Sequence, residues 1–317
     1  DRIGLKDSVR TVGQLLDRYS VDVVPAKGAS TRKLNLNAIV NLKKAFDKLP
    51  LADMIPMMVY RYVDIRSKKT VKEDGTKVGG KVVAHREVDL LSHAYTKAVE
   101  WGYINRHPFK GEVRLEGEKP RTRYVQDWEI DEVLAMGSKR SAGSIKAIQA
   151  YIRIKIMTGM DRKTLLTLTV SDITDDGIKI ARSKVAHSSG KETIYEMTPE
   201  LVEALQQAKD ARPAISPYLF CNRNGEGYYN LETGRANGWD SMWQRFMDRL
   251  LKETKVRERF TEHDLRAKAG SDAATLEDAR KLLSHASAET TKKIYRRKAE
   301  RVQPLPLPKK AAGNGAE

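Results

Sequence analysis

The sequence predicts a mainly α-helical protein with a small antiparallel β-sheet, organised as a helical N-terminal domain followed by an α+β C-terminal domain. The chain has 317 residues, enough for two domains of roughly 100–200 residues each. Apolar residues recur at helical spacing along much of the chain, and two short strand-like runs lie in its second half. The composition, 40% hydrophobic and 32% charged, is that of a folded protein.

Residues 1–108 are predicted to form a small helical bundle that ends near Pro108. A short helix is expected over 57–65, followed by a basic, glycine-containing flexible loop over 68–81. That loop is either solvated charge or a contact with a DNA backbone, and both interpretations stay open. Three more helices are marked by apolar residues at helical spacing: Val9, Val12, Leu16 and Tyr19; Leu36, Ile39, Val40 and Phe46; Val88, Leu91, Ala94, Ala98 and Trp101.

A charged stretch without periodicity, residues 109–123, predicts an extended linker between the two domains. The second domain, residues 124–300, is expected to begin with a helix through Leu134, with Asp127 as its N-cap. Residues 301–317 are rich in Pro, Ala and Gly, which predicts a flexible C-terminal tail.

Inside the second domain, the apolar rhythm of residues 144–158 predicts a buried helix. Short strands are expected at 177–181 and 193–197, separated by the turn-rich segment 185–191, so that they form a hairpin sheet. A helix over 198–209 follows, with a proline in its first turn.

The net charge of +16 favours a polyanionic partner, because Lys and Arg side chains that neutralise phosphates release condensed counterions. Ribosomal, membrane-surface and nuclease proteins share such an excess, so charge alone does not identify the partner. Cys221 is the single cysteine, and no paired Cys/His spacing typical of zinc sites occurs. Without an apolar run of about 20 residues, a cytoplasmic protein is expected. The chain begins at Asp1, so an upstream N-terminal module can be missing.

Two short motifs near the C-terminus carry candidate chemistry. His263 and Arg266 are three residues apart, so they share one face of a helix. Further on, a helix is expected to end at Ser284 and His285, and another to carry Tyr295. Separately, a surface His/Arg pair and a packed tyrosine are ordinary features. It is their combination that indicates a site.

His-x-x-Arg, then Leu-x-His, then a tyrosine at this spacing resembles the C-terminal signature of the tyrosine recombinases, the phage integrase family. The resemblance runs in order along nearly the whole chain. It implies a core-DNA-binding domain at 1–108 and a tyrosine-recombinase catalytic domain at 124–300. Other segments resemble the family's first box, its β-hairpin lysine and two further family segments: 157–173, Lys184, 216–220 and 98–104.

The resemblance implies roles that the chemistry of phosphodiester cleavage requires: a nucleophile, donors for the phosphoryl oxygens and an acid for the leaving 5′-oxygen. Tyr295 is the implied nucleophile, which would form a 3′-phosphotyrosine link. Arg266 would bind the phosphate with its planar fork of donors. His263 and His285 would donate hydrogen bonds or move protons, and Lys184 is the candidate acid. Because the link conserves bond energy, no cofactor, metal or nucleotide is expected.

For Lys184, an ordinary solvated hairpin lysine remains an equal alternative, since Lys179 and Lys191 lie nearby. His187, in the same loop, is expected to be an ordinary loop residue. Lys184 is preferred because it directly follows the first strand.

The first box departs from the family pattern at two positions. Asp161 stands where the family has an arginine, and Thr164 where it has an acidic residue. One explanation is that Arg162 serves as the phosphate-binding arginine, with Asp161 turned to pair with a neighbouring cation. The other is that one arginine is lost, at a cost on the order of 10²–10³ in rate.

The leading hypothesis is a site-specific DNA recombinase, an integrase acting on double-stranded DNA. The resemblance implies a monomer in free solution, a homo-tetramer in a synapse that exchanges strands through a Holliday junction, and accessory DNA-bending or excision factors. Two alternatives stay open: a catalytically weak DNA-binding protein of the same fold, and a type IB-like topoisomerase. The small helical N-terminal domain disfavours the topoisomerase.

Overall fold

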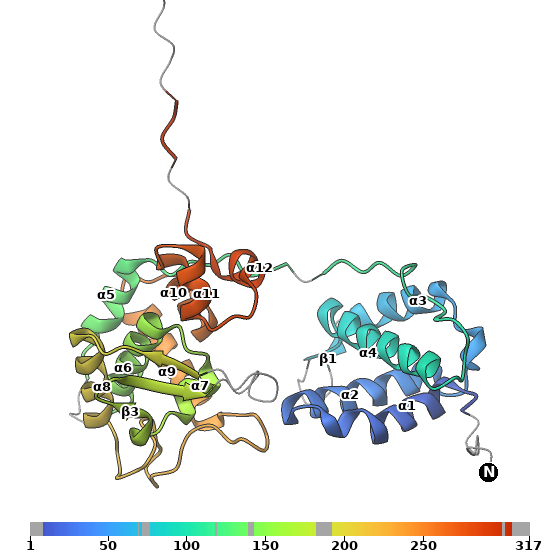
Figure 1. The fold of residues 1–317 in the computed structure, drawn as a ribbon, viewed down its shortest axis with the longest axis horizontal. Coiled ribbons are helices and arrows are strands. Elements are labelled where there is room, and N and C mark those ends of the chain that lie inside the picture. The colour runs from blue at the N-terminus through green and yellow to red at the C-terminus, as the bar shows by residue number, and fades with distance from the viewer. Residues whose placement is uncertain are drawn as a thin grey trace, which may run out of the picture. The chain divides into compact units, whose positions relative to one another are not determined.

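A computed structural model of the chain describes residues 9–68, 70–71, 77–117, 119–138, 143–181, 192–299 and 302–305. The chain divides into two compact units, residues 1–119 with 230–235, and residues 120–229 with 236–317. The described part is mainly helical and contains a three-stranded antiparallel sheet (Figure 1). The predicted fold class is therefore confirmed.

The first unit is a helical bundle around one hydrophobic core. Its helices are α1 (Val12–Asp22), α2 (Ala29–Phe46), α3 (Pro56–Ser67) and α4 (Lys81–Glu100), with 3₁₀ turns η1 (Val24–Ala26) and η2 (Leu51–Asp53). α4 contacts the other three helices (Figure 1). The side chains of Leu16, Ile39 and Leu91 are buried, as the predicted spacing requires, whereas Leu36 and Val40 of the predicted pattern are exposed.

Two boundaries in this unit differ from the sequence prediction. α2 begins at Ala29 and α4 at Lys81, both several residues before the first apolar residue of the predicted pattern. Inside the predicted loop, the short strands β1 (Thr70–Val71) and β2 (Lys77–Val78) pair antiparallel, and residues 72–76 lie outside the described part. The apolar spacing therefore located the helices but missed their first turns.

The predicted linker shares residues with both units. Phe109 is buried in the core of the first unit, and Leu115 packs against that core. At its other end, Arg121 binds Asp264, and Arg123 binds a carboxylate in the second unit. Among the described residues, only a short central stretch lacks such contacts.

The second unit is built around α6 (Ser144–Thr158), which contacts α8, α9 and α10. α6 has the predicted bounds. In α5 (Asp127–Ala135), however, Gln126 and not Asp127 is the N-cap, and its backbone N–H donates a hydrogen bond of 2.9 Å to the Glu129 carboxylate. Around α6 lie α7 (Arg162–Thr167), the 3₁₀ turn η3 (Val170–Asp172), α8 (Pro199–Asp210) and α9 (Asn237–Glu253).

The sheet of the second unit has the order β3-β4-β5. Its strands are β3 (Ile173–Thr174), β4 (Gly177–Ala181) and β5 (Glu192–Tyr195), and Ile178 pairs with Tyr195 in an antiparallel register. β4 has the predicted bounds, whereas β5 is one residue earlier at its start and shorter at its end. Residues 182–191, which include the predicted turn, lie outside the described residues.

The C-terminal part supplies most of the candidate site. It contains α10 (Glu262–Asp272), α11 (Leu276–Leu282), the single turn α12 (Ala288–Thr290) and the π-helical turn η4 (Thr291–Tyr295). α10 contacts α11 and η4 (Figure 1). This packing brings His263 and Tyr295 to the same place.

Candidate active site

A cavity of about 710 Å³ opens in the second unit. Its wall comes from the C-terminal end of α6, the start of α7, the strands β4 and β5, the start of α10 and the segment after α11. Every described residue that the sequence nominated as catalytic lies on this wall: Arg162, His263, Arg266, His285 and Tyr295. Lys184 lies outside the described residues.

Arg266 is held by the backbone of two other segments. Its guanidinium donates hydrogen bonds to the carbonyl oxygens of Gly159 and, at 2.7 Å, of Leu283. Gly159 ends α6 with a φ of 63°, and a Cβ there would lie 2.7 Å from a Leu283 methyl carbon. The close approach of these segments requires glycine and fixes the plane of the guanidinium.

The two histidines flank the ring of Tyr295. The ring centroids of His285 and Tyr295 are 4.7 Å apart, and those of His263 and Tyr295 are 5.1 Å apart. His285 also lies 3.3 Å from the guanidinium of Arg266. Burial lowers the pKa of His263, and the nearby charge of Arg297 lowers it further, so its imidazole stays neutral at pH 7.

Tyr295 is nearly buried, with 9% of its surface exposed, and the guanidinium carbon of Arg266 lies 5.6 Å from its ring centre. Ser271 donates a hydrogen bond of 2.7 Å to the Tyr295 carbonyl oxygen and accepts one of 2.7 Å from the Arg297 backbone. α10 therefore holds the chain on both sides of the tyrosine.

A buried network of ion pairs and hydrogen bonds around Asp264 holds the start of α10 and the segment after Tyr295 together. The fully buried carboxylate of Asp264 accepts bonds from Arg121 at 2.9 Å, from Arg297 at 2.6 Å and from the Thr261 backbone at 2.9 Å. Burial alone would raise the pKa of Asp264, but these bonds hold the pKa below its usual value. Sequence reasoning missed this network.

In the first box, Asp161 lies on the cavity wall at the start of α7. Its carboxylate is the N-cap of α7 and accepts hydrogen bonds from the Thr164 backbone at 3.0 Å and from the Thr164 hydroxyl at 3.1 Å. The expectation that Asp161 turns to an ion-pair partner is therefore wrong: a helix cap engages it. These bonds and nearby Arg266 outweigh burial and lower its pKa.

Arg162 lies on the cavity wall but is engaged by two carboxylates. Its guanidinium forms ion pairs with Asp240 and, at 3.2 Å, with Glu262. Glu262 also accepts a hydrogen bond of 2.8 Å from the indole of Trp239, a fully buried side chain. Burial and these charges fix Arg162 beside the start of α10.

One cavity residue was overlooked in the sequence. Lys155 is only 1% exposed and lines the cavity from the last turn of α6. Its position on the apolar face of a predicted buried helix was the available signal, because lysine is rarely buried without a partner.

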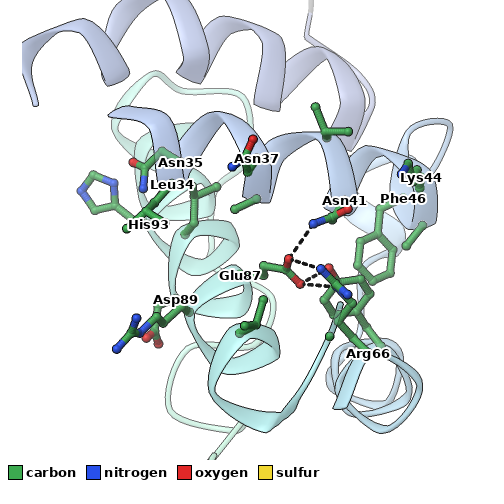
Figure 2. Close-up of a pocket in the computed structure, with 18 of the residues that line it drawn as sticks. Leu34, Asn35, Asn37, Asn41, Lys44, Phe46, Arg66, Glu87, Asp89 and His93 are labelled. Carbon is green, nitrogen blue, oxygen red and sulfur yellow. Dashed lines mark hydrogen bonds and ion pairs between the residues drawn. The ribbon is translucent and has the colours of Figure 1, made fainter. Parts of the chain in front are cut away.

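The first unit carries a separate groove of about 1480 Å³ between α2, α3 and α4 (Figure 2). Asn37 and Lys44 on α2 are exposed at it, and Asn35 is half-buried. Exposed Arg61 and Arg86 add positive charge from α3 and α4. The groove thus combines cations with amide side chains.

A buried carboxylate, Glu87, underlies this groove (Figure 2). It accepts bonds from Arg66 at 2.9 Å, from the Tyr62 hydroxyl at 2.7 Å and from Asn41 at 2.8 Å. Burial and this carboxylate raise the pKa of Tyr62. The carboxylate is fully engaged, so it adds little repulsion toward an anion in the groove.

Within the described ranges, no group of three or more His, Cys, Asp or Glu side chains is arranged to hold a metal ion. No described helix is long and apolar enough to cross a membrane.

The fold is similar to that of several solved integrases. A lambda integrase dimer bound to a COC′ core site has a TM-score of 0.68 at 17% identity, covering 94% of this chain and 100% of that one. A lambda integrase tetramer bound to a Holliday junction has a TM-score of 0.66 at 18% identity, covering 95% and 81%. The Tn1549 transposon integrase in complex with transposon right end DNA has a TM-score of 0.64 at 16% identity, covering 89% and 93%.

No curated protein sequence matches the chain significantly. The sequence profile of the phage integrase family, in contrast, matches residues 127–301, more than half of the chain. That range includes the whole cavity wall around His263, Arg266, His285 and Tyr295. The chain belongs to the phage integrase family, the tyrosine recombinases.

Proposed function

We propose that the protein is a site-specific DNA recombinase that cleaves and rejoins DNA through a 3′-phosphotyrosine intermediate. One observation carries the proposal: Tyr295, His263, Arg266 and His285 surround a single cavity, although up to 32 residues separate them in the sequence. A tyrosine flanked by cationic and proton-carrying groups suits attack on a phosphodiester.

Each side chain then has a distinct task. Tyr295 attacks the phosphorus and displaces the 5′-oxygen, which leaves with a proton. Arg266 and His285 donate hydrogen bonds to the non-bridging oxygens, because they are adjacent and face the tyrosine ring. Neutral His263 accepts the phenolic proton. Lys184 is proposed as the acid for the leaving oxygen, on the resemblance alone.

We further propose that the groove of the first unit receives double-stranded DNA. Asparagine reads adenine edges and arginine reads guanine edges in the major groove, and both residue types line it. The solved integrases of the same fold are DNA complexes, one of them a tetramer on a Holliday junction. The domains at 1–108 and 124–300 then clamp a duplex, and monomers assemble into a tetramer only on DNA.

The decisive experiment selects the DNA site and tests the nucleophile together. The full chain is incubated with nicked duplexes that carry a randomised core, and DNA that stays attached in SDS is sequenced. We expect adducts enriched for one sequence, which Tyr295→Phe abolishes while leaving DNA binding intact. Adducts that persist in Tyr295→Phe would refute the assignment of the nucleophile.

A second candidate function, DNA binding with little cleavage, is favoured by one feature. Asp161 adds a negative charge to the wall of the phosphate cavity, and Arg162 already pairs with two carboxylates. Binding of the duplex pool without any adduct would establish this alternative. Relaxation of a supercoiled plasmid that lacks the selected site would instead indicate a topoisomerase.

A further inference from the structure

Lys155 places an ammonium group in the wall of the cavity. Its Nζ donates a hydrogen bond of 2.9 Å to the Met160 carbonyl oxygen, and the Tyr151 hydroxyl lies 3.4 Å away. An ammonium has three N–H donors, and among the described residues these two acceptors are its hydrogen-bond partners. One donor therefore remains for a group that enters the cavity.

Burying this charge is costly. Burial lowers the pKa of Lys155 to about 8, although the negative charge of Glu262 partly opposes the shift. Within the described part of the chain, no carboxylate forms an ion pair with it. A methionine would fill the same space without this penalty. Packing alone therefore does not account for a lysine here.

The balance of charges on the cavity wall explains why a charged side chain is buried at position 155. On the cavity wall, Glu262 offsets Arg162, and Asp161 offsets Arg266. Among the described charged groups of the wall, Lys155 is then the cation that leaves the cavity positive. Without it, the cavity would have no net attraction for a phosphate.

We propose that Lys155 binds the scissile phosphate and supplies the positive charge that the first box lacks at Asp161. The inference rests on the proposed strand-cleavage function and adds a catalytic residue to it. In the complex, Nζ donates a hydrogen bond to a non-bridging phosphoryl oxygen while keeping its bond to Met160. Arg162 instead stays in its ion pairs beside α10.

The first test compares variants in single-turnover adduct formation on the selected nicked duplex. We expect Lys155→Met to slow the reaction about 10²–10³-fold, and Asp161→Arg in that background to restore at least tenfold. Lys146→Met, on the same helix but outside the cavity, is the matched control and keeps the wild-type rate. Arg162→Ala is expected to change the rate less than Lys155→Met does.

A methylphosphonate at the scissile position separates a charge-binding role from a structural one, because it lacks the phosphate's negative charge. On this substrate the defect of Lys155→Met should shrink to less than tenfold. The thermal midpoint of Lys155→Met should equal or exceed that of the wild type, since a buried charge is removed. A wild-type rate for Lys155→Met, or a defect of equal size on both substrates, overturns the inference.

Tungstate, a phosphate-like oxyanion, tests the site without DNA. We expect it to raise the thermal midpoint of the wild type and of Lys146→Met, and to leave Lys155→Met unchanged. If the wild type forms no DNA adduct, the proposed function fails, but this measurement still decides the role of Lys155. Equal tungstate shifts in all three proteins would refute anion binding by Lys155.

Discussion

The imidazole Nδ1 of His285 lies 2.9 Å from the hydroxyl of Thr291, a fully buried side chain on the turn that carries Tyr295. The ring is thereby fixed between the guanidinium of Arg266 and the phenol. Thr291 acts through His285, so it is a positioning residue.

Replacing Thr291 by valine keeps the shape of the side chain but removes the hydroxyl that lies against the imidazole Nδ1 of His285. We expect single-turnover adduct formation to fall about tenfold, the loss of one hydrogen bond of about 1.4 kcal/mol, with DNA affinity unchanged. Thr291→Ser keeps the hydroxyl and should react at close to the wild-type rate. A valine variant that cleaves as fast as the wild type would show that the contact has no role.

The lowered pKa of His263 predicts how stability depends on pH. In the unfolded chain the imidazole of His263 takes up a proton near pH 6.5, whereas in the folded chain it does so only at lower pH. Neutral His263 therefore contributes fully to the stability of the fold above about pH 6.5, and this contribution is lost as the pH falls. Urea unfolding at pH 7.5 and 5.5 should show a smaller loss for His263→Asn than for the wild type. Because His93 and His107 also have lowered pKa values and are present in both proteins, only the difference is informative.

Removing the negative charge of Asp264 should greatly lower the free energy of unfolding. Asp264→Asn leaves the nearly buried Arg297 without its carboxylate, so we expect unfolding to become about 3–5 kcal/mol easier in urea. Glu203→Gln, which breaks an ion pair of exposed Glu203 with Arg153, should leave the midpoint unchanged. Equal effects of the two substitutions would mean that the network is not held by charge.

If the groove of the first unit binds DNA, Lys44 should make a salt-dependent contact with a phosphate. If Lys44 neutralises one phosphate, Lys44→Met lowers the slope of log affinity against log salt by about 0.9. Lys48 is exposed nearby but does not line the groove, so Lys48→Met carries the same charge change without the contact. Fluorescence anisotropy on a labelled duplex measures both, and equal slopes would exclude the groove as the DNA site.

Local patterns in the sequence predicted what depends on local spacing. α6 and β4 have their predicted bounds because their apolar residues follow one clear period. The same signal marks α9, where Trp239, Phe246 and Leu250 are buried at helical spacing, yet that helix was not predicted.

Long-range pairing could not be predicted in this way. Arg121 binds Asp264 across 143 residues, and no spacing rule connects them. The Asp161 cap also depends on where α7 begins, which follows from packing and not from a motif. The resemblance supplied the site residues that local reasoning could not join, but it gave no role to Lys155.

The hydrogen bond from Trp239 to Glu262 places a fluorescent side chain next to the cavity. The indole is fully buried, and its ring centroid lies 4.6 Å from that of Tyr151. Its hydrogen-bond acceptor, Glu262, forms an ion pair with Arg162 on the cavity wall. A protein in which Phe replaces the other three tryptophans, Trp101, Trp128 and Trp243, would emit from this single indole. Its emission would then report, in real time, any change in the charges around this cavity when DNA is added.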